Sequence, residues 1–230
     1  MPPSLNPTKA FYDRISTAYD LIADGSEHTA RDRGIELLAP SPGESGLVVG
    51  FGTGHSLVAM ARAVGAAGRI FGVDISEGML SVARRRIVDE RVEEQVEISL
   101  GDARHLTYGN DQFDMVFIAF TLELFDDQDI RPVLEQLRRV LRPGGRLGVV
   151  AMSKEQQETV MTEIYVWMHR HFPHWVDCRP ISVTTYLQSA GFVVERTETR
   201  SLWGLPVMIA MARKPGNVTL ISSSATPLIS

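Results

Sequence analysis

The residues best placed to do chemistry begin with a glycine-rich segment. In Val48-Val49-Gly50-Phe51-Gly52-Thr53-Gly54-His55, an apolar run leads into glycine at every second position and then into a helical pattern. Glycines permit positive φ and let a ligand lie against bare backbone, and a helix N-terminus offers unpaired N–H groups to a polar ligand. This arrangement predicts a nucleotide-binding loop.

Two common classes of glycine loop fit this segment poorly. A dinucleotide loop would need a third glycine in Gly-x-Gly-x-x-Gly, but that place falls on His55 or on Leu57. A loop that cradles a triphosphate would end in Gly-Lys followed by Ser or Thr, and this ending is absent. The loop alone therefore does not choose its ligand.

Two aspartates follow the next apolar runs. Asp74 comes directly after Ile70-Phe71-Gly72-Val73, and Asp102 lies in Gly101-Asp102-Ala103. Ligands of open α/β sheets bind at the carboxyl edge, where Asp74 could accept the two hydroxyls of a ribose and Asp102 could meet an adenine amine. Either aspartate alone could be a helix cap or a turn residue. Together with the glycine loop, they predict an adenosine site.

The elements that would position these residues alternate between short apolar runs and longer amphipathic stretches, which is typical of β-α units. The expected strands are Leu47–Phe51, Arg69–Val73, Val96–Leu100, Met115–Ala119 and Arg146–Met152. The expected helices are Ser56–Val64, Ser76–Asp89 with a serine N-cap, Asp129–Leu141, Thr159–Phe172 and Ser182–Ala190.

Two further strands, Phe192–Thr199 and Val207–Ala212, follow without a crossover helix and predict an antiparallel hairpin at one sheet edge. The expected fold is thus α/β, a Rossmann-like doubly wound sheet of seven mostly parallel strands with helices on both faces. Residues 1–40, with helical stretches at Phe11–Ile22 and Ala30–Leu38, predict an N-terminal helical cap. Residues 41–214 form the main domain, and Pro215–Ser230 is expected to be a flexible tail.

Composition limits the possible partners and location. The chain has 230 residues, of which 44% are hydrophobic, and a formal charge of −5, which argues against a nucleic-acid backbone as partner. No apolar run reaches the roughly 18 residues of a membrane-spanning helix, and no secretory signal pattern opens the chain, so we expect a cytoplasmic protein. The one cysteine, Cys178, cannot form an internal disulfide. A small-molecule substrate is expected, and the chain could form a homodimer.

The ordered motifs resemble those of class I S-adenosylmethionine-dependent methyltransferases. The motifs are Leu47–Gly54, Gly72-Val73-Asp74-Ile75-Ser76, Gly101-Asp102-Ala103, Phe113-Asp114-Met115-Val116 and Leu141-Arg142-Pro143-Gly144-Gly145-Arg146-Leu147. Phe11-Tyr12-Asp13-Arg14 and Ala18-Tyr19-Asp20 are similar to the ubiquinone/menaquinone-biosynthesis branch. The resemblance implies S-adenosylmethionine as cofactor. It implies a cofactor-binding set of Gly50, Phe51, Gly52, Gly54, Asp74, Ile75, Met79, Asp102, Ala103, Phe120 and Tyr19.

The sequence departs from this family at one place. The family usually carries an acidic residue two positions before the first loop glycine, where this chain has Val48. The usual acceptor for the methionine ammonium is therefore missing. Backbone carbonyls near Gly50 or the carboxylate of Glu123 could replace it, or cofactor affinity is altered.

No catalytic residue and no metal site can be assigned from the sequence. Methyl transfer needs mainly alignment of the acceptor, with a base only when the acceptor holds a proton. The candidate bases are His55, Glu123, His169, His171 and His174, and the histidine spacing does not match a metal pair on one helix face. Tyr12 and Tyr19 could close over the cofactor. An apolar acceptor pocket could be lined by Phe120, Leu122, Leu124, Trp167, Trp175 and Trp203.

The function that these observations favour is transfer of a methyl group from S-adenosylmethionine to a small acceptor that is apolar, quinone-like or a lipid. One alternative is a nicotinamide-dependent oxidoreductase, which is disfavoured by His55 and Leu57 at the positions where its loop would need a third glycine. The other is a non-catalytic adenosine-binding protein, for which Val48 is the best argument.

Overall fold

The computed structural model describes residues 25–154, 180–202 and 205–216. Its core is one seven-stranded sheet in the order β3-β2-β1-β4-β5-β7-β6. The strands are β1 (Ser45–Val49), β2 (Arg69–Asp74), β3 (Val96–Leu100), β4 (Phe113–Ala119), β5 (Leu141–Met152), β6 (Val193–Leu202) and β7 (Leu205–Arg213). Strands β1 to β5 pair in parallel, while β7 pairs antiparallel with both β5 and β6. The predicted fold class is confirmed, including the C-terminal hairpin.

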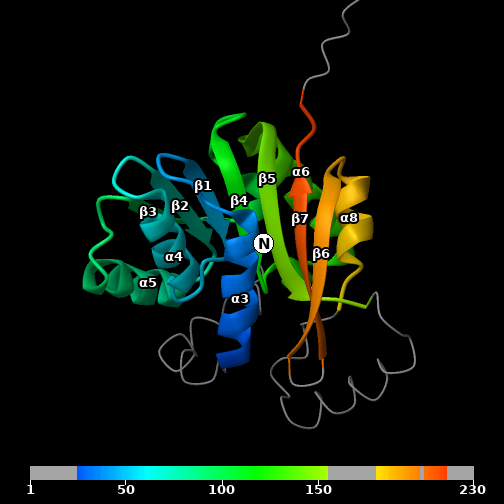
Figure 1. Ribbon diagram of the computed structural model, residues 1–230, viewed down its shortest axis with the longest axis horizontal. Helices are drawn as coiled ribbons and strands as arrows, with labels where there is room; N and C mark the ends of the chain where they lie inside the picture. Colours follow the sequence, from blue (N-terminus) through cyan, green and yellow to red (C-terminus); the bar gives the residue numbers. More distant parts are fainter. Residues whose placement is uncertain (1–24, 155–179, 203–204, 217–230) are drawn as a thin grey trace, which may run out of the picture.

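Helices cover both faces of the sheet (Figure 1). They are α3 (Gly25–Leu38), α4 (His55–Val64), α5 (Glu77–Asp89), α6 (Asp127–Val140) and α8 (Val183–Ser189), with the 3-10 turns η1 (Ala103–His105) and η2 (Leu122–Leu124). One buried apolar cluster joins α3, α4 and α5 to one face, and a second joins α6 and α8 to the other. No helix in the described ranges is long and apolar enough to cross a membrane.

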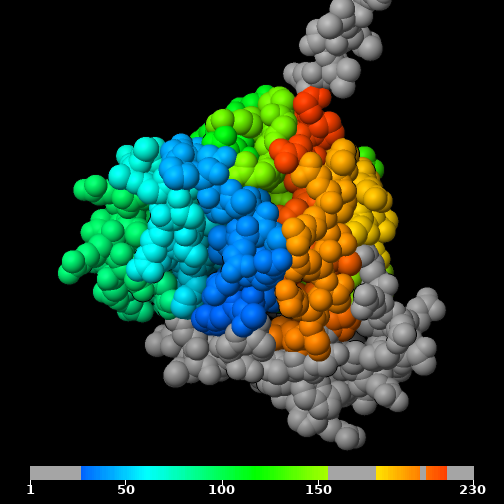
Figure 2. Space-filling model, viewed as in Figure 1, coloured from blue at the N-terminus to red at the C-terminus, as the bar shows by residue number. Residues whose placement is uncertain are grey.

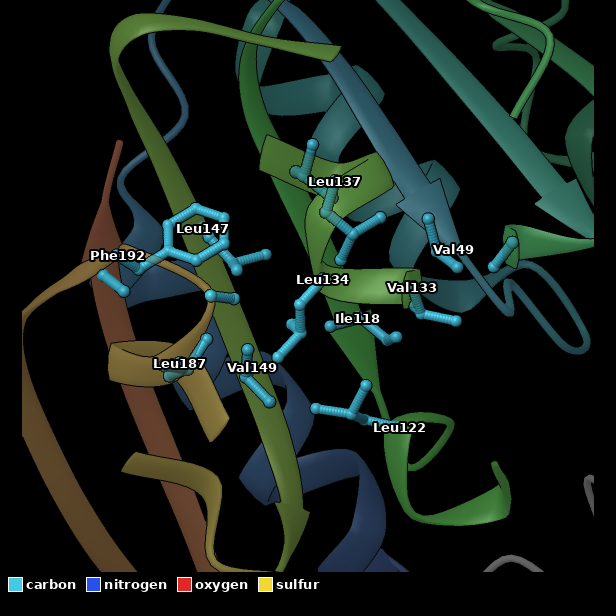
Figure 3. Packing of buried hydrophobic residues seen from close by; sticks show 14 of the residues in the cluster. Val49, Ile118, Leu122, Val133, Leu134, Leu137, Leu147, Val149, Leu187 and Phe192 are labelled. Carbon is cyan, nitrogen blue, oxygen red and sulfur yellow. The ribbon is translucent and has the colours of Figure 1, made fainter. Parts of the chain in front are cut away.

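The core on the α6 side is built from aliphatic side chains of facing elements (Figure 3). Val133, Leu134 and Leu137 of α6 meet Ile118 of β4 and Val149 of β5, and all are buried. The α6 residues recur at helical spacing, and the strand residues alternate, so each element presents one apolar face to the other. Leu122 belongs to the same cluster and therefore anchors η2, just beyond the tip of β4.

Helix α3 runs against the direction of the parallel strands. Its C-terminal carbonyl of Leu38 accepts a hydrogen bond from Arg146 Nε, near the beginning of the parallel part of β5, at 3.0 Å. Arg33 pairs bidentately with Glu198 of β6, at 2.9 and 2.7 Å. In the space-filling view, α3 lies between α4 and β6 (Figure 2). The helix therefore begins at the carboxyl edge of the sheet, where ligands of this fold class bind.

Several predicted boundaries were wrong. Strand β1 ends at Val49, so Phe51 lies in the loop, and β5 begins at Leu141 rather than Arg146. Between Leu141 and Arg146 the register with β4 shifts, and Gly144 has a left-handed φ of 78°. Gly144 N donates to Lys214 O and Lys214 N donates to Gly145 O, both at 2.9 Å, so this irregular segment is bonded to the residue that follows β7. The helix expected at Thr159–Phe172 and that at Phe11–Ile22 lie outside the described residues.

Candidate functional site

The glycine loop connects β1 to α4 in a left-handed backbone. Gly50, Gly52 and Gly54 have φ of 65°, 53° and 91°. A Cβ built on Gly50 would lie 2.2 Å from Thr121 Oγ1, so the segment after β4 packs directly on the loop and leaves no room for a side chain. A Cβ on Gly52 would meet nothing within 4 Å, so the space over this residue is open. A ligand can thus approach the backbone of Gly52.

Asp74 ends β2 and is bonded to the glycine loop. Its Oδ2 accepts a hydrogen bond from Gly52 N at 2.9 Å, and its Oδ1 accepts one from Ser76 N at 2.9 Å. Each carboxylate oxygen can accept a second hydrogen bond. The loop and the acid that sequence analysis assigned to one adenosine are therefore in direct contact, and the carboxylate is oriented by two backbone donors.

The beginning of α5 follows Asp74 at once. Ser76 is its N-cap, as predicted, and its Oγ accepts from Met79 N at 3.1 Å. Met79 is buried, whereas Ile75 is half-buried. The cap fixes the turn that carries Ile75 beside the Asp74 carboxylate. Contact of Ile75 and Met79 with the cofactor stays a prediction.

Asp102 lies beside this group, because Gly101 N donates to Asp74 O at 2.8 Å. Its carboxylate is engaged by Arg104, with Nε at 3.1 and 3.0 Å from Oδ1 and Oδ2 and Nη2 at 2.6 Å from Oδ2. Burial acts to raise the pKa of Asp102, but the hydrogen bonds and charge of Arg104 outweigh it and hold the pKa below its usual value. Ala103, the next residue, is buried in η1. Sequence analysis did not foresee Arg104, and the adenine contact of Asp102 stays a prediction.

The residues that follow β4 form the next part of the carboxyl edge of the sheet. Phe120 is half-buried with φ of 51°, and its N donates to Val150 O at 2.7 Å. Thr121 Oγ1 donates to Ala119 O at 2.9 Å and lies 3.5 Å from Gly50 O. These bonds hold the backbone that leads into η2 against the glycine loop.

Glu123 in η2 is 1% exposed. Its Oε1 accepts from Met152 N, at the end of β5, at 3.2 Å. Burial raises the pKa of this carboxyl to about 7, and the charge of Glu27 on α3 adds to the rise. Glu27 is itself 4% exposed, and sequence analysis missed it. Its signal was the spacing of Glu27, Ala30, Gly34 and Leu38, which places all four on one helix face.

Three of the remaining candidates lie in the described residues, His55 directly after the glycine loop and Leu122 and Leu124 in η2. His55 begins α4, with its ring 4.6 Å from that of His28 and Arg86 Nη1 2.7 Å from its Nδ1, so a cation rather than an open space faces the ring. Leu122 is packed in the core. The candidates that lie outside the described residues are Tyr12, Tyr19, Trp167, His169, His171, His174, Trp175 and Trp203.

Comparison with known proteins identifies the family and the fold. Residues 47–145 match the family model described as a methyltransferase domain. A demethylmenaquinone methyltransferase from Clavibacter sepedonicus is 31% identical over 90% of this chain and 89% of that protein. One from Lactobacillus johnsonii is 32% identical over 64% of this chain and 63% of that protein. The first relatives are matched over only 63%, 59% and 59% of their own length.

A solved structure has the same fold. The S-adenosylmethionine-dependent methyltransferase from Aquifex aeolicus matches with a TM-score of 0.65 and 20% identity, over 86% of this chain and 97% of that chain. This likeness concerns the fold, while the sequence relatives and the ordered motifs concern the family. The chain belongs to the class I S-adenosylmethionine-dependent methyltransferases and is similar to their ubiquinone/menaquinone-biosynthesis branch.

Proposed function

We propose that this protein transfers a methyl group from S-adenosylmethionine to a carbon of a small quinone-like ring. The observation that carries the proposal is the hydrogen bond of 2.9 Å from Gly52 N to the Asp74 carboxylate. It holds the glycine loop beside the carboxylate that we propose as the acceptor for the ribose hydroxyls. The open space over Gly52 and the buried Glu123 carboxyl also suit an adenosine cofactor that carries an amino-acid chain. Its sequence relatives are methyltransferases of quinone biosynthesis, and none of these observations favours the oxidoreductase or non-catalytic alternatives.

The bound cofactor supplies an electrophilic methyl group on a sulfonium. In this proposal, Asp74 holds the ribose hydroxyls, Asp102 and Ala103 flank the adenine, and the glycine loop lies against the methionine chain. Phe51, Ile75, Met79, Phe120 and Tyr19 would exclude water from the cofactor. Alignment of two reactants accounts for a large share of rate enhancement in such a displacement. A ring carbon that gains the methyl group loses its hydrogen as a proton, which passes to a base or to solvent, and no base is assigned here.

The acceptor is the part that the relatives' names support. They are demethylmenaquinone and ubiquinone/menaquinone-biosynthesis methyltransferases, which favours a quinone-like ring over a lipid head-group amine. The formal charge of −5 also disfavours a nucleic-acid substrate.

Isotope-labelled methyl transfer tests this function. The purified full chain is incubated with methyl-labelled S-adenosylmethionine and a chemically reduced demethylmenaquinone, with phosphatidylethanolamine vesicles as a parallel acceptor. We expect label in the quinone, as a product heavier by one methyl group. Label in the lipid alone would mean that the acceptor is a lipid head group and not a quinone-like ring. Cell extract serves as a third source of acceptors. If the protein binds S-adenosylhomocysteine but labels neither acceptor and nothing in the extract, the proposal that it is a catalyst is overturned.

A further inference from the structure

The side chain of residue 48 faces the side of the sheet that α3 covers. Val48 is 2% exposed and packs in the same buried cluster as Ala30 of α3 and Leu57 of α4. An acid at this position would be the usual partner of the cofactor's ammonium group in proteins that this sequence resembles. Here β1 offers only a methyl-bearing side chain, so a cofactor held by this loop needs an anion from another element.

Glu123 has an unused acceptor at this edge of the sheet. Its Oε1 is bonded to Met152 N, but its Oε2 is buried and makes no hydrogen bond within the described part of the chain. Buried polar atoms in native proteins nearly always have partners. This buried oxygen can therefore accept a hydrogen bond from a donor on a ligand.

The local fold sets the position of this oxygen. Thr121 packs on Gly50, and Glu123 follows two residues later in η2. Leu122 points into the core on the α6 side, and successive side chains of a 3-10 turn diverge by a third of a circle. Glu123 thus leaves the α6 side, at the carboxyl edge of the sheet, two residues after the threonine that packs on Gly50.

A second buried acid reaches the same place from α3. Glu27 lies on the sheet-facing side of that helix and is close enough for its charge to act on Glu123. Its neighbour His28 contacts the ring of His55, which directly follows the glycine loop. The two buried carboxyl groups therefore act on each other, and their combined negative charge suits a cationic ligand group.

We propose that Glu123, assisted by Glu27, binds the α-ammonium group of the cofactor's methionine chain and thereby replaces the acid that β1 lacks. An ammonium carries three donors and a full charge, which suits an orphaned carboxylate oxygen and a second carboxylate. This assignment rests on the proposed S-adenosylmethionine dependence. It moves the anionic contact from β1 to η2 and α3.

Calorimetry with two ligands tests the assignment on the full chain. S-adenosylhomocysteine carries the ammonium, whereas 5′-methylthioadenosine carries the adenosine without the amino-acid chain. Glu123→Gln keeps the size of the side chain and an oxygen for Met152 N but removes the charge. We expect it to weaken S-adenosylhomocysteine at least tenfold and to leave 5′-methylthioadenosine within about twofold. Glu27→Gln should have a smaller effect of the same kind.

Glu135→Gln, an exposed change on α6, is the matched control and should leave both affinities unaltered. Equal weakening of both ligands by Glu123→Gln would overturn the assignment, because the acid would then shape the adenosine site. Loss of kcat with unchanged S-adenosylhomocysteine affinity would also overturn it and make Glu123 a base toward the acceptor. If Glu123→Gln does not fold, Glu27→Gln gives the same comparison. Failure of wild type to bind S-adenosylhomocysteine would instead refute the proposed cofactor.

Discussion

At the scale of single residues, Asp74 has two tasks. It fixes the glycine loop and the turn into α5 through Gly52 N and Ser76 N, and in the proposed function it also accepts the ribose hydroxyls. Charge-assisted hydrogen bonds are worth roughly 1.5–3 kcal/mol each. The affinity of the site should therefore depend strongly on this one carboxylate.

We predict that Asp74→Ala weakens S-adenosylhomocysteine on the order of a hundredfold or more, since a pair of such bonds is lost together. Asp74→Asn should be milder, because it keeps one acceptor oxygen, although its amide cannot accept from both backbone donors. Calorimetry should give the order wild type, Asn, Ala. An alanine variant that binds within about threefold of wild type, a difference below ~1 kcal/mol, would reduce Asp74 to a turn residue.

At the scale of elements, α3 depends on a close approach to the sheet. Glu27, Ala30, Gly34 and Leu38 form its buried face. A Cβ on Gly34 would lie 2.6 Å from Val150 Cγ2 and 3.1 Å from a ring carbon of Phe117. Both of these side chains are buried, so neither can move away freely. Glycine at this position lets the helix hold Glu27 against the carboxyl edge.

We predict that Gly34→Ala destabilises the protein by about 1–2 kcal/mol, because overpacking outweighs the gain in helix propensity of about 1 kcal/mol. Urea unfolding measures the change. Asp32→Ala, on the exposed side of the same helix, is the control and should alter stability by less than about 0.5 kcal/mol. An alanine at position 34 that stabilises the protein would mean that α3 can shift without cost.

At the scale of the whole molecule, Glu123 couples folding to pH. Its pKa is about 7 in the folded protein, against an ordinary 4.5 that applies when the chain is unfolded. Between these values the folded state binds more protons than the unfolded state, so stability is full below pH 4.5 and falls as pH rises toward 7. Among the described residues, the charge that acts on this group is that of Glu27.

We predict that wild type loses about 3 kcal/mol relative to Glu123→Gln between pH 4.5 and pH 8, since each pKa unit is worth about 1.4 kcal/mol. Urea unfolding of the ligand-free proteins across this range measures the difference. The variant should be the more stable protein at pH 8 and should still bind S-adenosylhomocysteine more weakly. Parallel pH profiles for the two proteins would show that Glu123 titrates normally.

The sequence by itself determined the layout of the fold and the cofactor loop. The spacing of apolar residues distinguishes the apolar strand Ile70–Val73 from the amphipathic helix that follows it, and Ser76 marks the beginning of that helix. The glycines at 50, 52 and 54 permit the left-handed backbone that the loop adopts. These features depend on neighbouring residues, so a single chain suffices to predict them.

The tertiary structure decided how the acids are used. Glu27 and Glu123 lie far apart in the chain and meet only because α3 begins at the carboxyl edge of the sheet. Arg104 pairs with Asp129 of α6 as well as with Asp102, and the backbone of Lys214 pairs with Gly144 and Gly145 near the beginning of β5. These contacts join elements that are distant in the chain, and local propensity carries no information about them.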